Sequence, residues 1–421
     1  MATLRTYTLG CKVNQYETEL VREGLLRIGY RDAEPGETAD LCVINSCTVT
    51  GEADSKSRQA IRRLIRQNPA ARVVVMGCYA TRAPDEVRSI PGVSEVITDK
   101  REIPDWLGRF GVRDLPDGIS RFGHRHRAYI KIQDGCYLRC TYCIIPQVRP
   151  HVSSRPVEEI VREVRRLVAN GYREIVLTGI HLGHYGVDRN LGKPKAQWVR
   201  LSTLLQELVA LPEEFRIRLS SMEATEVTDE LLEVMAAHPH RICPHLHICL
   251  QSGSDAVLRR MRRRWGVRRF LDRVRLVRSV LDQPCLTTDV IVGFPGETED
   301  DFQQTLQACR EAGFAKIHIF PFSPRRGTPA AQMPDPVPPE VCRERIERLA
   351  RCERQLRQRY LESLLGRSLD VLVESPAEPP LSGYAGTSCR YMPVVVRSDS
   401  CRPGELVRVR PAQINREVLV V

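Results

Sequence analysis

Lysine, aromatic residues and long apolar runs are all scarce in this chain. Only 7 of its 63 basic residues are lysine, aromatic residues make up 6% of its 421 positions, and no apolar run approaches the ~20 residues that span a bilayer. The N-terminal segment MATLRTYTLG also lacks the basic and then apolar layout of a signal peptide. We therefore expect a cytoplasmic protein with no membrane partner.

The composition is otherwise that of a globular protein. Hydrophobic residues make up 42% and charged residues 27%, which argues against extended disorder. A length of 421 residues is too great for one compact core, so about three domains are expected. The net charge of +11 rests on arginine, which binds phosphate through two parallel hydrogen bonds. A phosphate-rich partner is one explanation for this excess, and a codon bias toward arginine is the other.

Changes in composition and in the pattern of apolar residues predict three domains, at residues 1–112, 126–357 and 363–421. In the first domain, short apolar strands alternate with polar helical stretches, which predicts a parallel α/β sheet. The strands are expected at residues 5–9, 41–45 and 72–77, and the helices at residues 17–28, 52–67 and 84–89. A polar stretch rich in glycine and arginine, residues 111–125, is predicted to be a linker.

The same alternation runs longer in the second domain and gives six strand candidates. They lie at residues 129–133, 174–179, 216–221, 245–251, 286–292 and 316–322. A helical stretch follows each of the first five, so the fold class is α/β with an incomplete (β/α)6 barrel at its centre. After a helix predicted at residues 340–365, β-branched runs separated by glycine and proline predict a small all-β barrel of about five strands.

Fifteen cysteines in a chain without an export signal favour metal or catalytic roles over disulfides. The sharpest signal is DGCYLRCTYCIIP, in which Cys136, Cys140 and Cys143 directly follow the first barrel strand. Three thiolates this close together can hold an iron–sulfur cube and leave its fourth iron open. The same spacing would suit one face of a helix, but Gly135 and Pro146 favour a loop.

A second set of cysteines follows the strands of the first domain. Cys11, Cys47 and Cys78 lie at the carboxyl ends of the three predicted strands. Because these ends share one edge of a parallel sheet, the fold would bring the three thiols together. Three buried structural cysteines are the alternative.

The other nine cysteines show no such layout, and we interpret them as core or incidental residues. Among them are Cys42, Cys249, Cys285, Cys309, Cys342 and Cys352. His181 and His184 in TGIHLGHYG could suggest a metal pair. Their three-residue spacing in a glycine-rich loop is instead typical of ordinary loop residues.

CxxxCxxC just after the first barrel strand resembles the radical S-adenosylmethionine superfamily. In that family the open iron binds the amino and carboxylate groups of S-adenosylmethionine, and an electron from the cluster splits the sulfonium to give a 5′-deoxyadenosyl radical. With the second cysteine set and the three domains, the whole chain resembles the methylthiotransferases, and its tail resembles the TRAM RNA-binding domain. The segments are TLGCKVNQYETE, NSCTVT, GCYA, DGCYLRCTYCIIP, RLSSMEATEVTDELLE, HLHICLQSGSDAVLRRMRRR, TTDVIVGFPGETEDDF and FPFSPRRGTPAA.

The resemblance implies an enzyme that inserts sulfur and a methyl group at an unactivated C–H bond. Its cofactors would be two 4Fe-4S clusters and S-adenosyl-L-methionine, with Cys11, Cys47 and Cys78 on the auxiliary cluster. The segment CKVNQYETE is similar to the branch acting on threonylcarbamoyladenosine at position 37 of tRNA. The implied partners are the anticodon loop of tRNA, an external electron donor and a sulfur donor.

Other readings stay open. Related branches act on isopentenyladenosine in tRNA or on a ribosomal-protein aspartate, and a non-catalytic iron–sulfur redox sensor that binds RNA is an alternative of another class. Three positions depart from the family pattern, because Cys249 and Ala224 stand where proline is usual and Gln147 where an aromatic residue is usual. None of these departures removes a cluster ligand.

Residues at the ends of the barrel strands are expected to contact S-adenosylmethionine, because a barrel presents its ligand contacts there. Glycine allows close approach of the backbone, and hydroxyl, amide and carboxylate groups can bond the ribose and methionyl ends. The six candidates are Thr178, Gly179, Ser221, Glu223, Gln251 and Ser252.

The positive charge is concentrated in residues 259–278, where ten arginines and one acid give +9 of the chain's +11. Such a one-sided stripe predicts contact with an RNA backbone, and a solvated helix face is the alternative. The candidates for RNA contact are Arg259, Arg260, Arg262, Arg263, Arg264, Arg268 and Arg269. In the tail, Tyr384 and Tyr391 are candidates for stacking on bases.

Overall fold

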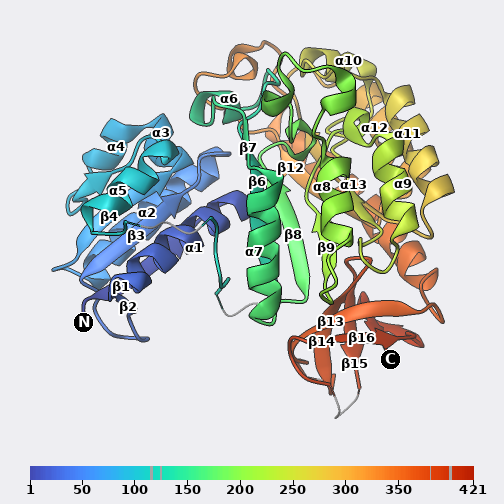
Figure 1. The fold of residues 1–421 in the computed structure, drawn as a ribbon. Coiled ribbons are helices and arrows are strands. Elements are labelled where there is room, and N and C mark those ends of the chain that lie inside the picture. The colour runs from blue at the N-terminus through green and yellow to red at the C-terminus, as the bar shows by residue number, and fades with distance from the viewer. Residues whose placement is uncertain (114–116, 124–125, 380, 398–400) are drawn as a thin grey trace.

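The structure is a computed structural model that describes residues 1–113, 117–123, 126–379, 381–397 and 401–421. Figure 1 shows an N-terminal α/β body in blue, a barrel of strands and helices from green to orange, and a small β body in red. The α/β fold class and its three parts are thereby confirmed. Over the residues so described, no helix is both long enough and apolar enough to pass through a membrane.

The N-terminal sheet has five parallel strands in the order β2-β1-β3-β4-β5. The strands are β1 (Thr3–Thr8), β2 (Arg31–Asp32), β3 (Leu41–Ser46), β4 (Arg72–Gly77) and β5 (Glu95–Val96). The helices are α1 (Lys12–Arg27), α2 (Gly51–Gln67), α3 (Cys78–Arg82), α4 (Pro84–Arg88) and α5 (Ile103–Arg109), with a short 3-10 turn η1 (Lys100–Glu102). Strand β3 is buried along its whole length because apolar clusters cover both faces of the sheet.

The three predicted strands of this sheet are confirmed, and the two shortest strands were absent from the prediction. β2 and β5 have two residues each, too few for a periodic pattern. Helix α1 begins at Lys12, earlier than the apolar period indicates, because the turn after β1 leads straight into it.

The barrel has six parallel strands in chain order, as predicted, together with the antiparallel two-residue strand β7 (Ser153–Ser154). The parallel strands are β6 (Arg127–Asp134), β8 (Glu174–Gly179), β9 (Arg216–Leu219), β10 (His245–His247), β11 (Cys285–Val292) and β12 (Lys316–Pro321). They form two sheets, β7-β6-β8-β9 and β10-β11-β12, which the bridges Ile217–Ile242 and Met222–Ile248 join into one open barrel.

Helices cover the outer face of the barrel and bury its main apolar core. They are α6 (Ile145–Val148), α7 (Val157–Ala169), α8 (Leu201–Val209), α9 (Asp229–Ala237), α10 (Asp255–Arg260), α11 (Val267–Val280), α12 (Glu299–Ala312) and α13 (Pro339–Glu362). Short 3-10 turns are η2 (Leu182–His184), η3 (Asp188–Asn190), η4 (Lys195–Gln197), η5 (Ala224–Glu226) and η6 (Pro329–Gln332). The predicted domain end at residue 357 falls inside α13.

Residues 111–125 do not form the free linker that their polar composition predicts. Ile119 and Phe122 are 0% and 3% exposed and belong to the barrel core. The backbone N–H of Ile119 donates to Glu163 at 2.7 Å, and that of Phe122 donates to the Tyr172 hydroxyl at 2.6 Å. Two apolar residues are enough to dock a mostly polar segment. Residues 114–116 and 124–125 of this predicted linker lie outside the described residues.

The C-terminal sheet has six strands, one more than predicted, in the order β16-β13-β14-β15-β18-β17. They are β13 (Leu369–Pro376), β14 (Tyr384–Ser388), β15 (Pro393–Val396), β16 (Leu406–Val409), β17 (Gln413–Asn415) and β18 (Val418–Val420). All pairs are antiparallel except β15 with β18.

This sheet closes the end of the barrel where the parallel strands begin (Figure 1). Arg218 donates to the carbonyls of Ser388 and Cys389 at 2.9 and 3.1 Å, and its guanidinium pairs with the buried Glu174 at 3.0 Å. Tyr391 lies over the same guanidinium, 4.8 Å from its carbon. At the opposite end, where the strands finish, the loop after β6 carries Cys136 and the loop after β8 carries His181.

Candidate active site

The first cysteine set lies on one edge of the N-terminal sheet, as the strand order predicts. Cys11, Cys47 and Cys78 follow the neighbouring strands β1, β3 and β4. Burial is the largest cause that raises the pKa of Cys47, and the nearby Cys78 and Cys11 raise it further, to about 11. A Cβ placed on Gly10 would lie 3.0 Å from the Cys47 sulfur. The three thiols therefore share one small region.

Glycine precedes two of these cysteines because the backbone there is left-handed. Gly10 has φ +101° and Gly77 has φ +98°, in a region that residues with a Cβ rarely adopt. A Cβ on Gly77 would also come within 2.3 Å of the Asn45 side chain. The sharp turn lets Cys78 begin α3 at the edge of the sheet.

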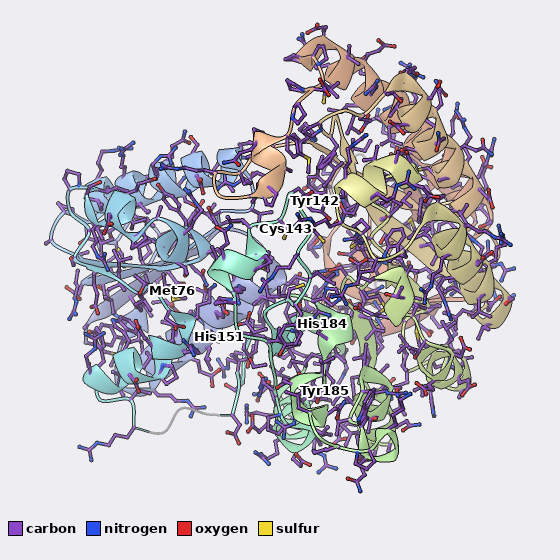
Figure 2. All side chains as sticks on the ribbon, turned by 90° about the horizontal axis from the view of Figure 1, so that it is seen from above. Met76, Tyr142, Cys143, His151, His184 and Tyr185 are labelled. Atoms are coloured by element: carbon purple, nitrogen blue, oxygen red, sulfur yellow. The ribbon has the colours of Figure 1, made fainter. Side chains whose placement is uncertain are left out.

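The second cysteine set lies in an irregular loop between β6 and α6, so the alternative of a helical face is wrong. Gly135 opens this loop with φ +74°, and a Cβ there would meet the His151 carbonyl at 2.1 Å. Cys140 and Cys136 both raise the pKa of Cys143, and burial, the main cause, brings it to about 12. Figure 2 shows Cys143 and Tyr142 between the N-terminal body and the barrel.

The two sets are packed against each other through α6. Cys78 forms one apolar cluster with Ile144, Ile145 and Val148, which directly follow the second set. On its other side, Cys78 accepts a hydrogen bond from Lys100 Nζ at 3.5 Å. The two groups of thiols thus belong to one site that spans both domains.

A cavity of about 230 Å³ is lined by residues next to both sets. Val49 and Thr50 contribute from the loop that carries Cys47, and Cys143 contributes from the second loop. Gln251 and Phe320 enter from the carboxyl ends of barrel strands. A small molecule in this cavity would contact residues of both thiol-bearing loops.

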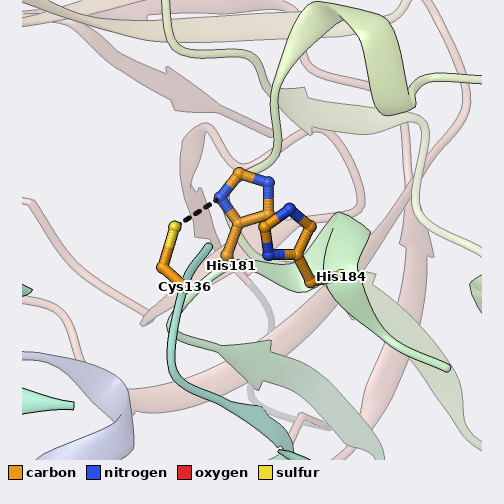
Figure 3. Close-up of side chains that lie close together, drawn as sticks. All are labelled: Cys136, His181 and His184. Atoms are coloured by element: carbon orange, nitrogen blue, oxygen red, sulfur yellow. Dashed lines mark hydrogen bonds between the residues drawn. The ribbon is translucent and has the colours of Figure 1, made fainter. Parts of the chain in front are cut away.

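His181 lies directly beside the second cysteine set. Its interpretation from the sequence as an ordinary loop residue did not predict this position. Its Nδ1 is 3.6 Å from the Cys136 sulfur, as Figure 3 shows, and its Nε2 is hydrogen bonded to Glu226. Burial lowers the pKa of His181, but the bonds to Cys136 and Glu226 outweigh it and raise that pKa to about 10. The ring of His184 stacks on His181 at 3.9 Å, and burial lowers the His184 pKa to about 4.

Glu223, a predicted cofactor residue, is held by two buried donors. Arg263 pairs with its carboxylate and also donates to the Cys140 sulfur at 3.5 Å. Trp265 Nε1 donates to the same carboxylate at 2.8 Å. The Arg263 side chain is only 3% exposed. Arg263 therefore lies inside the site, and its prediction as an RNA contact is corrected.

The other predicted cofactor residues fall into two groups. Thr178 and Gln251 are buried at strand ends, Ser221 and Gly179 are partly exposed there, and a Cβ on Gly179 would come within 2.9 Å of Gln133. Ser252 is also buried, at 1% exposed, and its contact with the cofactor stays a prediction. Its hydroxyl accepts from the Ser254 N–H at 3.2 Å and lies 3.4 Å from the Thr305 hydroxyl on α12.

The arginine stripe is only partly on the surface. Arg260 is half-buried and donates to the carbonyl of Gly296 at 2.8 Å, and its contact with RNA stays a prediction. The exposed members are Arg259, Arg262, Arg264, Arg268 and Arg269. In the tail, the Tyr391 ring lies against His245 in a tilted arrangement, with 4.7 Å between the ring centres, and both Tyr384 and Tyr391 are partly exposed.

A network of buried charges joins the two cysteine-bearing loops. Arg149 donates to Glu17 and Asn14 on α1, and to Asp134 at the end of β6. Lys131 pairs with the same Glu17 at 2.8 Å. These contacts fix the helix that begins beside Cys11 against the strand that leads to Cys136.

Most of the nine remaining cysteines are buried, as the core interpretation predicts. Cys42, Cys243, Cys285, Cys309, Cys352, Cys389 and Cys401 are buried, and Cys249 and Cys342 are partly exposed.

Two family descriptions match this chain. Residues 130–309 match the Radical SAM superfamily, and residues 3–99 match the Uncharacterized protein family UPF0004. Among solved structures, the radical S-adenosylmethionine methyltransferase TsrM from Kitasatospora setae, with cobalamin and a [4Fe-4S] cluster bound, aligns with a TM-score of 0.56. It is 16% identical and covers 79% of this chain and 77% of that chain, which shows the fold alone.

Curated relatives extend over nearly the whole sequence. The threonylcarbamoyladenosine tRNA methylthiotransferase MtaB of Bacillus subtilis (strain 168) is 40% identical over 430 residues, covering 97% of this chain and 94% of that protein. The MtaB protein of Thermotoga maritima is 39% identical, covering 91% and 89%. The tRNA-2-methylthio-N(6)-dimethylallyladenosine synthase of Acidothermus cellulolyticus is 35% identical, covering 99% and 87%. The chain therefore belongs to the radical S-adenosylmethionine tRNA methylthiotransferase family.

Proposed function

We propose that this enzyme converts threonylcarbamoyladenosine at position 37 of tRNA to its 2-methylthio derivative. The observation that carries the proposal is the cavity lined from both thiol-bearing loops, because one base must reach a sulfur source and a radical source. The relatives with the highest identity given above, at 40% and 39%, bear the name of this activity.

The enzyme uses two [4Fe–4S] clusters and S-adenosylmethionine. Their donor chemistry fits this chain, which offers two separate sets of three thiols, each lacking a fourth cysteine ligand in its loop. We assign the auxiliary cluster to Cys11, Cys47 and Cys78, and the cluster that binds S-adenosylmethionine to Cys136, Cys140 and Cys143. When bound, these groups supply the radical, the sulfur and the methyl group.

The chain's own residues bind and orient S-adenosylmethionine and the target base. We assign Thr178, Gly179, Ser221, Glu223 and Gln251 to S-adenosylmethionine, since each lies at the open end of the barrel. Arg263 and Trp265 hold the Glu223 carboxylate in place by their hydrogen bonds. The apolar lining of the cavity, which includes Val49 and Phe320, excludes water from the reacting base.

We further propose that the exposed arginines of the stripe bind the anticodon loop of tRNA. We expect the enzyme to act in the cytoplasm. An external electron donor and a sulfur donor complete the reaction. The exposed arginines lie on the barrel beside α10 and α11, so a bound phosphate backbone would follow these helices.

Mass spectrometry of tRNA nucleosides tests the substrate. Cells that lack this gene should lose the 2-methylthio derivative of threonylcarbamoyladenosine, and the wild-type gene should restore it. Persistence of that nucleoside in a strain with no second such enzyme would refute the proposal. Loss of the methylthio derivative of dimethylallyladenosine would instead favour the second candidate, which the 35% identity to the Acidothermus cellulolyticus enzyme supports.

Iron analysis tests the cluster ligands. Anaerobic reconstitution should give about eight irons per chain, and about four when Cys11, Cys47 and Cys78 are changed to alanine. Changing Cys42, Cys309 and Cys352 to alanine is the matched control, which should keep about eight. An unchanged count in the first variant would overturn the auxiliary assignment.

A further inference from the structure

Three side chains on the inner face of the barrel have no role in the site described above. His247, Asp289 and His318 come from the adjacent strands β10, β11 and β12, and their ligand atoms all lie within 4.8 Å of one another. His247 Nε2 is 3.3 Å from the Asp289 carboxylate. Asp289 pairs with His318 across the two parallel strands, which places both on the same face.

We call this group of three residues the polar triad, and Thr287 contacts one of its histidines. The Thr287 hydroxyl lies 3.0 Å from His247 Nδ1 and 3.3 Å from His245 Nε2. Because Thr287 occupies one side of the His247 ring, the opposite nitrogen is directed toward Asp289. His247 is therefore held between Thr287 and Asp289.

The polar triad adjoins the cavity between the two cysteine sets. Asp289 lines that cavity together with Gln251, whereas much of the remaining lining is apolar, including Val49, Ile291 and Phe320. A base in the cavity would thus have apolar walls and one polar end. That end is directed along the inner face of the barrel.

A lysine from the N-terminal domain lies close enough to act on the charge of two histidines of the barrel. Lys12 lies 6.0 Å from the centre of the Tyr129 ring, and its charge acts on the pKa of His318 and of His245. Burial, together with Arg218 and other nearby arginines, lowers the pKa of Lys12. Among the described residues, no carboxylate lies within ion-pair distance of Lys12. It is a partly buried cation without a carboxylate partner among those residues.

The neighbouring charges do not supply that counterion. Arg127, Arg216 and Arg218 surround Glu174, and Arg127 also pairs with Glu374. With Asp289 of the triad counted, these three cations are balanced by three carboxylates, and Lys12 adds one positive charge that is not balanced. The inner face of the barrel therefore carries a surplus of positive charge, which favours an anionic ligand group.

We propose that Lys12 and the polar triad recognise the carboxylate-bearing side group on N6 of the target adenosine. The inference rests on the proposed function, because the threonylcarbamoyl group has one carboxylate, one hydroxyl and ureido N–H groups. Lys12 and the two imidazoles bind the carboxylate, and Asp289 accepts from the hydroxyl or an N–H. A dimethylallyl group can make none of these contacts and would leave the polar groups of the site without a ligand partner.

Two histidines and a carboxylate are also a donor set for a divalent metal. The surplus of positive charge and the unpaired Lys12 oppose a cation at this place. The amino-acid group is therefore the better occupant, and metal content becomes an outcome of the test.

The test uses the full-length reconstituted enzyme and three anticodon stem-loop RNAs. They carry on N6 the threonylcarbamoyl group, its neutral threonine methyl ester, or the dimethylallyl group. The measurements are KM and kcat for methylthio formation, and the dissociation constant of each RNA. The variants are Lys12→Met and His318→Phe, with Lys56→Met and His240→Phe as controls on exposed positions.

The wild type should prefer the acid to the ester by about 10- to 100-fold in KM and in RNA affinity. His318→Phe and Lys12→Met should reduce that preference to within about threefold, with the iron content unchanged, and both controls should keep it. His318 is remote in sequence from the cysteines, so its variant remains informative even if Lys12→Met disturbs Cys11.

Two results would overturn this inference and leave the proposed function intact. In one, the wild type uses acid and ester equally, or the variants weaken both RNAs by the same factor. In the other, the wild type retains zinc or iron beyond the clusters and His318→Phe loses it. Turnover of the dimethylallyl RNA alone by the wild type would overturn the proposed function itself.

Discussion

Arg149 donates to both carboxylate oxygens of Glu17, at 2.8 Å each. The pair joins the loop that follows Cys143 to the helix that follows Cys11, so it is one of the buried contacts between the two cysteine sets. Both partners are buried, with side chains 1% and 4% exposed. Breaking such a pair leaves an unpaired charge inside the protein, which costs far more than losing a surface ion pair.

Arg149→Met should therefore destabilise the protein by about 3–5 kcal/mol, because Glu17 and Asp134 lose one of their two shared cations and keep only Lys131. Thermal unfolding of the apoprotein measures this effect. Arg88→Met is the control, since Arg88 pairs with Asp85 in solvent and should change stability by less than about 1 kcal/mol. Equal effects of the two changes would contradict the interpretation.

The same pair predicts a dependence of stability on acid. Burial would raise the pKa of Glu17, but Arg149 and Lys131 outweigh it and lower that pKa to about 2. Because the folded-state pKa lies below the ordinary value of 4.5, the stabilisation is fully present above about pH 4.5 and is lost as the pH falls toward 2.

Urea unfolding at a series of pH values measures this loss, which should reach on the order of 3 kcal/mol. In Glu17→Gln the Glu17 part of the pH dependence should disappear between pH 4.5 and 2. If the wild type and this variant follow the same pH curve, Glu17 is not the group that titrates.

Arg263 and Arg264 are neighbours in sequence with different expected roles. Arg264→Gln should weaken tRNA binding and reduce the slope of log affinity against log salt by about 1, because Arg264 is exposed. Arg263→Gln should leave that slope unchanged and weaken binding of S-adenosylmethionine, because it releases Glu223. Filter binding at several salt concentrations and equilibrium dialysis separate the two effects.

Gly135→Ala should disrupt the loop of the second cysteine set, because its Cβ would meet the His151 carbonyl at 2.1 Å. Reconstituted iron should fall from about eight to about four per chain. The control is Gly171→Ala, which has φ +94° but no atom within 4 Å of the new Cβ. That control should keep its iron and lose about 1–2 kcal/mol of stability from the left-handed backbone alone.

The sequence by itself determined the α/β class, the six barrel strands and the grouping of six cysteines. These features follow local rules, since apolar period, strand ends and close cysteine spacing are visible in neighbouring residues. Cys11, Cys47 and Cys78 could be grouped without coordinates because parallel strands share one carboxyl edge.

Only the tertiary structure decided which side chains of those segments face inward. Arg263 and Arg264 are indistinguishable in a run of arginines, and packing alone buries the first against Glu223. His181, Lys12 and the polar triad meet their neighbours across domains or strands distant in sequence. Such contacts depend on how the strands are placed side by side, a property that no local pattern records.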